Sequence, residues 1–165
     1  MTSFLPDASL SLSTLVQNFG LTLMYAQIVE DDLKLIVAAG TSLGLITTGT
    51  RKKHPCFGDL KEIIKRNRKE GDTDDVYDLF DQANQARRLL AHRFFIEHAV
   101  DLMTEAGHEA INQHLSKLFL TICQARCNST ALRNAIFLRM GLSENEARDK
   151  LEEIKRTILD DDENT

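Results

Sequence analysis

The stretch QARRLLAHRFF, residues 85–95, crowds arginines and a histidine among apolar side chains. A helix turns by about 100° per residue, so Arg88 and His92 share one face, whereas Arg87 lies about 140° from His92. Leucine, alanine and phenylalanine surround these groups, and a partly desolvated guanidinium or imidazole interacts strongly with an anion. The stretch is therefore a candidate anion-binding site.

A purely structural role is the alternative for the same residues. Buried pairs of arginine with a carboxylate are common, and the first predicted helix supplies three acids, Glu30, Asp31 and Asp32. From the spacing alone, pairing within the chain is the commoner outcome. Both interpretations stay open at the level of residue types.

The elements that must position these residues are all predicted to be helical. Apolar residues recur at helical spacing along most of the chain, and no segment shows the alternation of a strand. The predicted helices cover residues 13–39, 59–70, 74–106, 108–127, 131–140 and 144–159. Gly40 and Gly107 are expected to end the first and the longest helix. The pattern predicts an all-α protein, an antiparallel bundle of about five helices with a long loop after the first.

Ser143 and Glu146 form the sequence signature of a capping box, which should begin the last helix. A length of 165 residues suits one domain with a sizeable core. We expect a lead-in at residues 1–12, a single helical domain at 13–159 and an acidic tail at 160–165.

The net charge of −5 argues against binding of a polyanion by the surface as a whole. Residues 51–69 are strongly basic and could offer a local basic surface, although an exposed solvated face is the commoner explanation. Three cysteines form no even disulfide framework. Cys123 and Cys127, four residues apart on an apolar helix, are expected to be buried.

No metal site and no cofactor are predicted. The histidine pairs His92/His98 and His108/His114 are each six residues apart, so the members of a pair diverge around a helix. No apolar run approaches the ~18 residues that a membrane span needs. We therefore expect no membrane association and a cytoplasmic location.

The sequence RRLLAH at residues 87–92 resembles the R-N-x-L-A-H form of the R-x4–6-H motif of the HEPN superfamily. These are all-helical domains that include many prokaryotic toxin and antiviral ribonucleases. The RFF that follows, and residues 25–30 of the first predicted helix, are also similar to sequences in that group. The resemblance covers most of the bundle in outline, and about a dozen residues carry it.

The resemblance implies a metal-independent endoribonuclease of toxin or defence type that acts as a homodimer. Arg87 and His92 would be catalytic, with His92 as general acid or base and Arg87 on the scissile phosphate. Arg88 and Arg93 would bind the RNA, and Glu30 would be an orienting or pairing acid. Cleavage would leave a 2′,3′-cyclic phosphate, and an antitoxin or regulatory protein would be a further partner.

The chain departs from the family's pattern at two positions. Arg88 stands where asparagine is usual, and Phe94 stands where some toxins carry a tyrosine that a partner modifies. Many members of the superfamily are inactive and act as dimerising or RNA-binding modules. The alternative function is a non-catalytic helical interaction or regulatory protein, either a transcription-linked scaffold or a neutralising partner.

Overall fold

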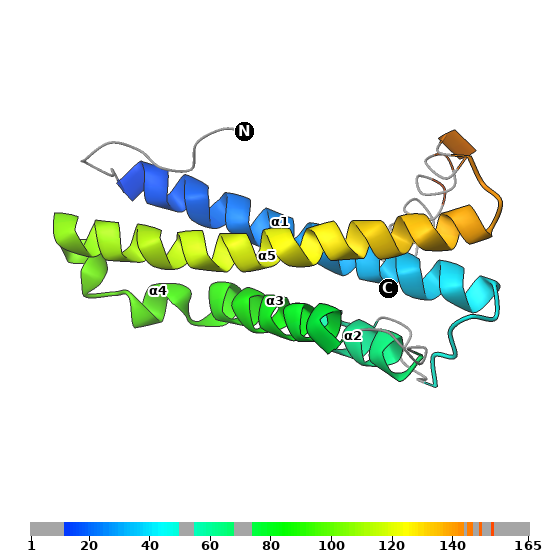
Figure 1. Ribbon diagram of the computed structural model, residues 1–165. Helices are drawn as coiled ribbons and strands as arrows, with labels where there is room; N and C mark the ends of the chain where they lie inside the picture. The colour runs from blue at the N-terminus through cyan, green and yellow to red at the C-terminus, as the bar shows by residue number, and fades with distance from the viewer. Residues whose placement is uncertain are drawn as a thin grey trace, which may run out of the picture.

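The chain folds into an elongated helical bundle, seen here in a computed structural model (Figure 1). The structure describes residues 12–49, 55–67 and 74–143, and also 145, 146, 149 and 153. Its helices are α1 (Leu12–Ser42), α2 (Phe57–Arg66), α3 (Asp74–His92), α4 (Phe94–Glu97) and α5 (Glu105–Arg139), with a short 3-10 turn η1 at Asp101–Met103. No described residue lies in a strand. The predicted all-α class is confirmed.

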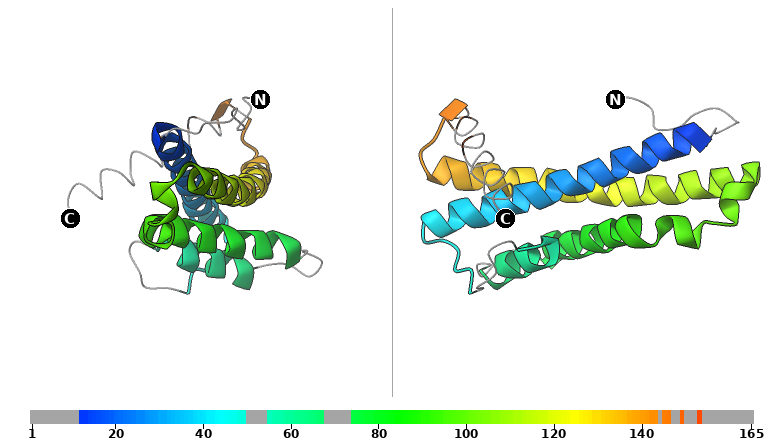
Figure 2. Two further views of the ribbon diagram at one scale, coloured as in Figure 1. Left: turned by 90° about the vertical axis from the view of Figure 1, so that its left-hand side faces the viewer. Right: turned by 180° about the vertical axis from the view of Figure 1, so that it is seen from behind.

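Two layers make up the bundle. The long helices α1 and α5 lie side by side and run in the same direction, and α2 and α3 cover them from one side (Figures 1 and 2). The chain reverses in α3, which is antiparallel to both long helices. Phenylalanines at the core include Phe57, Phe80 and Phe94, each no more than 1% exposed. These large side chains from α2, α3 and α4 fill the space beneath α1 and α5.

Gly40 does not end the first helix, which continues to Ser42. The chain turns back directly after it, with the amides of Leu45 and Ile46 donating to the Gly40 carbonyl at 2.8 and 3.0 Å. A Cβ at position 40 would lie 2.5 Å from the Ile46 side chain. The glycine is therefore needed for the close approach of the loop rather than as a helix terminator.

The long helix predicted for residues 74–106 is interrupted, so this prediction was wrong in its second half. Arg93 leaves the helical conformation (φ −133°, ψ −20°), and α3 ends at His92. The interruption allows Phe94 to be buried while α4 and η1 bend towards the start of α5. Gly107 does not end a helix but lies in the first turn of α5. A Cβ there would collide with the Asp101 carbonyl, so the glycine allows the chain before α5 to pass close to that turn.

Two helices predicted for residues 108–127 and 131–140 are a single helix, α5. Thr104 caps its start by accepting a hydrogen bond from the Gly107 amide at 3.0 Å. Across the expected break, Ser129 is fully buried and donates to Asp32 of α1 at 2.9 Å. This contact with α1 holds the segment in helical form despite its polar residues.

The predicted capping box is present. The amide of Ser143 donates to the Glu146 carboxylate at 2.8 Å, and the Glu146 amide reaches the Ser143 hydroxyl at 3.4 Å. Hydrogen bonds from Ser143 lower the pKa of Glu146. Most of the helix predicted after it, residues 1–11 of the lead-in and the acidic tail lie outside the described residues.

Candidate functional site

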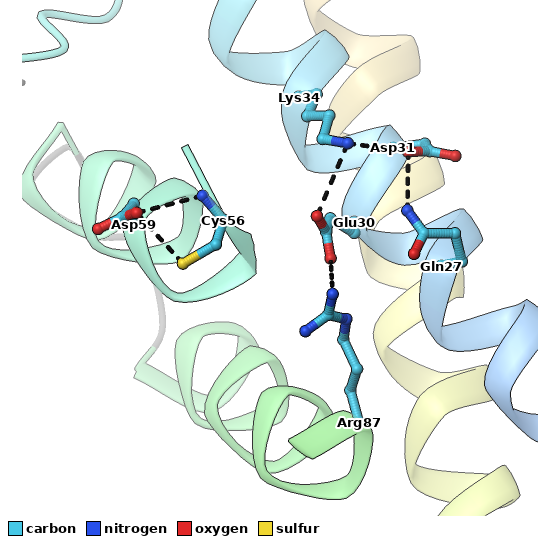
Figure 3. Close-up of polar contacts among 7 residues, drawn as sticks. All are labelled: Gln27, Glu30, Asp31, Lys34, Cys56, Asp59 and Arg87. Carbon is cyan, nitrogen blue, oxygen red and sulfur yellow. Dashed lines mark hydrogen bonds and ion pairs between the residues drawn. The ribbon is translucent and has the colours of Figure 1, made fainter. Parts of the chain in front are cut away.

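The centre of the candidate site is an ion pair between the first and third helices (Figure 3). Glu30 of α1 lies between two cations, with Arg87 Nη2 2.8 Å from its Oε2 and Lys34 Nζ 3.6 Å from its Oε1. The Glu30 side chain is 9% exposed and the Arg87 side chain 27%. Arg87 is thus anchored on one side by a buried carboxylate and remains partly open to solvent.

The contact between Arg87 and Glu30 is electrostatic more than directional. Oε2 of Glu30 is buried and makes no hydrogen bond of acceptable angle with any described residue, although a guanidinium nitrogen is within 2.8 Å. A carboxylate so placed depends on the adjacent positive charge for its stabilisation. Arg87 cannot be removed without leaving this charge poorly compensated.

Arg88 and His92 lie on a solvent-facing side of α3, four residues apart, and both are exposed. Neither side chain makes a hydrogen bond or ion pair with another residue that the structure describes. Their shared face follows from helical spacing. The same spacing separates them from Arg87, and no described hydrogen bond or ion pair joins Arg87 to His92.

Arg93 occupies the break between α3 and α4. Its side chain is 72% exposed and pairs with Glu97 one turn later, at 2.9 Å. An exposed pair of this kind contributes little to stability and opens readily. Arg93 therefore adds another accessible cation to Arg88 at this end of the molecule, near His92.

The acids near Glu30 have different partners. Asp32 faces α5, where its carboxylate pairs with Arg133 and accepts hydrogen bonds from Ser129 and Thr130. Asp31 is half-buried and contacts Lys34 at 3.4 Å and Gln27 at 3.2 Å on its own helix (Figure 3). Of the three acids considered as partners for the central arginines, only Glu30 contacts one of them in the described part of the chain.

A second polar cluster, which the sequence did not reveal, lies where α4 and η1 meet α5. His98 Nδ1 is 2.8 Å from Asp101 Oδ2, and His98 Nε2 is 2.8 Å from His114 Nδ1. Phe94 packs against both imidazoles, with ring centroids 4.8 and 5.6 Å away. Burial lowers the pKa of His114, and the nearby charge of His98 lowers it further.

The sequence predicted that His92 and His98 diverge around a helix, and likewise His108 and His114. The observed contact instead joins His98 of the first pair to His114 of the second. His98 and His114 are sixteen residues apart, so no helical periodicity relates them. No three histidine, cysteine, aspartate or glutamate side chains of the described residues are grouped so as to hold a metal ion. The cluster is a chain of hydrogen bonds and not a set of ligands.

The cysteines differ from the expectation that both would be buried. Cys127 is exposed, while Cys123 is half-buried and burial raises the pKa of its thiol. Both face a shallow groove beside Tyr25, over whose ring Arg126 is stacked at 4.7 Å.

None of the described helices combines the length and apolar character needed to cross a membrane. Comparison of the chain with protein-family models, with curated proteins and with solved structures found no match.

Proposed function

We propose that this protein is a HEPN-like RNA-binding protein that acts as a homodimer and cleaves RNA without a metal ion. One observation carries the proposal: Arg88 and His92 share an exposed face at the end of α3 while the adjacent Arg87 is fixed by the buried Glu30. RNA cleavage by its own 2′-hydroxyl uses cations that bind the phosphate and an imidazole that transfers protons, and the exposed Arg88 and His92 offer one of each on the same face.

In this mechanism His92 removes the proton from an RNA 2′-hydroxyl. The 2′-oxygen bonds to the adjacent phosphorus, the bond from phosphorus to the 5′-oxygen breaks, and a protonated histidine gives its proton to that oxygen. A second copy of the chain supplies this second histidine. Imidazole can act as the base in one subunit and as the acid in the other, because its pKa lies near neutral pH. The products are a 2′,3′-cyclic phosphate and a 5′-hydroxyl.

The arginines have separate roles in the proposal. Arg87 binds the scissile phosphate through the part of its guanidinium that Glu30 does not cover, since its side chain is 27% exposed. Arg88 and Arg93 contact the phosphates on either side and supply affinity that falls with added salt.

An apolar surface beside this site supports the dimer. Ile96, Val100 and Met103, in α4 and the turn after it, are 77%, 81% and 83% exposed. We define these three residues as the corner patch. Large apolar side chains exposed together mark protein contact surfaces, and the first of these three, Ile96, is four residues beyond His92.

A second function, non-catalytic interaction or regulation, is favoured by a different feature. The Arg87–Glu30 pair lies within one chain, as expected for an arginine whose role is structural. In that case the corner patch would bind the scaffold's partner, and Arg88 and His92 would only be solvated surface residues.

Purified protein incubated with single-stranded and hairpin RNAs in EDTA separates the two functions. Wild type should cleave RNA and leave cyclic phosphate ends, and His92→Ala should lower the cleavage rate by on the order of 100-fold or more. Arg88→Ala should weaken RNA binding, and the affinity that remains should fall less steeply with added salt. Arg139→Ala, an exposed arginine at the far end of α5, is the matched control and should behave as wild type.

Each outcome has a consequence. Binding without cleavage, in wild type as in His92→Ala, would exclude the enzyme and retain the RNA-binding module. If no RNA is bound or cut, the scaffold function replaces the proposal.

A further inference from the structure

An exposed aromatic side chain lies just beyond the break that ends α3. Phe95 stands in α4, three residues after His92 along the chain. The Arg93 amide donates to the Leu89 carbonyl and the Glu97 amide to the Arg93 carbonyl, both at 2.9 Å, so the break is short and α4 begins directly after Arg93.

The ring of Phe95 is held in place and yet accessible. Its centroid lies 4.5 Å from that of Phe19 on α1 and 5.8 Å from that of Phe94, the latter in an edge-on arrangement. Phe94 itself is 1% exposed, whereas Phe95 remains 41% exposed. A phenyl ring supported by two others and open to solvent is a rigid flat surface, and it is close along the chain to Arg88, His92 and Arg93.

We propose that Phe95 is a stacking platform for an unpaired nucleobase next to the phosphate bound by Arg88 and His92, so that the substrate is single-stranded RNA. This inference rests on the proposed function. Protein groups recognise single-stranded nucleic acid by combining aromatic rings, which stack on bases, with cations that follow the backbone. A base within a duplex is already stacked and cannot reach a ring on a helix surface.

The neighbours of Phe95 distinguish this role from that of the corner patch. Arg93, two residues before, is 72% exposed, and Arg88 and His92 are exposed at the end of α3. An aromatic ring close to cationic side chains suits a nucleotide, which offers both a π-face and a negative charge. The corner patch, by contrast, is made of aliphatic side chains and methionine.

The test measures binding of a fully 2′-O-methylated single-stranded oligonucleotide, which cannot be cleaved, and of its duplex. Wild type should bind the single strand more tightly and quench a 2-aminopurine placed in it. Phe95→Leu keeps an apolar side chain against Phe19 but removes the aromatic face, and should weaken binding on the order of tenfold and abolish the quenching. Phe95→Tyr should restore both. Thermal unfolding of each variant establishes that the fold is intact.

Two results would overturn the inference while leaving the proposed function standing: equal binding of single strand and duplex, or unchanged affinity and quenching in Phe95→Leu. Loss of self-association in Phe95→Leu with unchanged RNA binding would assign the ring to a protein contact instead. Absence of any RNA binding by wild type would remove the proposed function and the inference together.

Discussion

At the scale of single residues, the neighbouring acids of α1 determine where the guanidiniums lie. Glu30 holds Arg87 of α3 and Asp32 holds Arg133 of α5, so one turn of α1 ties both neighbouring helices by charge. A carboxylate buried to this extent is expensive to desolvate and requires a charged partner. The guanidinium of Arg87 is thereby held close to the Glu30 carboxylate.

Removing the Glu30–Arg87 pair should reveal this dependence. Glu30→Gln and Arg87→Met should each lower the free energy of unfolding by about 1–3 kcal/mol, because each leaves a poorly compensated partner. In the double variant the loss of unfolding free energy should be smaller than the sum of the two single losses by about 1 kcal/mol or more. Unfolding in urea measures all three.

Lys34→Met is the matched control, since it removes only the longer 3.6 Å contact to the same carboxylate and should cost less than about 0.5 kcal/mol. Additive losses in the double variant would show that Glu30 and Arg87 are not coupled, and would weaken the assignment of Glu30 as the residue that orients Arg87.

At the scale of elements, the corner formed by α4, η1 and α5 depends on the shared proton of two histidines. His98 donates to Asp101 through Nδ1 and meets His114 through Nε2. Only one hydrogen fits between Nε2 of His98 and Nδ1 of His114, so one of these nitrogens donates and the other accepts. A proton on both nitrogens would break the contact that holds α4 and η1 against α5.

This corner should make stability depend on pH. Burial, together with the charges of His98 and Lys117 and against that of Glu97, lowers the pKa of His114 below its usual 6.5. The unfolded chain therefore binds more protons than the folded one. The stabilisation that comes from the neutral His114 is complete above about pH 6.5 and is lost as the pH falls through the lowered pKa of this residue.

We expect the free energy of unfolding to fall below pH 6.5 with a slope of up to about 1.4 kcal/mol per pH unit from this group. His114→Gln should flatten that slope, whereas His92→Gln, which alters an exposed histidine, should not. Denaturation at several pH values measures both variants. Parallel profiles for wild type and His114→Gln would contradict the one-proton description of the corner.

At the scale of the whole molecule, the apolar side chains left exposed are unevenly placed. The corner patch lies at the end of the bundle where α3 finishes, in the same region as His92 and Phe95. The end of an elongated bundle offers only a small contact area, so a stable contact there needs apolar side chains. A two-fold contact through the corner patch would place both copies of His92 near the junction of the two subunits.

Self-association should therefore depend on the corner patch. Ile96→Lys should convert the protein to a monomer in sedimentation analysis, because it places a charge in the centre of the contact. Leu138→Lys is the matched control: Leu138 is also 77% exposed, but it lies at the other end of α5. Equal effects of the two substitutions, or none, would exclude the corner patch as the dimer surface.

The local properties of this protein could be predicted from its sequence. Helical periodicity gave the all-α class and the common face of Arg88 and His92, and the residue types gave the capping box at Ser143. These features depend on side chains within one or two turns of each other, and a 3.6-residue repeat is enough to relate them.

Tertiary structure decided the rest. The sequence offered three acids to the central arginines, and only the rotation of α1 against α3 and α5 directs Glu30 to Arg87 and Asp32 to Arg133. Burial of Phe94 accompanies the break at Arg93, and a bent corner brings His98 to His114. Such contacts depend on how helices distant in sequence are packed and rotated, because side-chain interlocking across an interface sets that geometry and no periodicity within one helix encodes it.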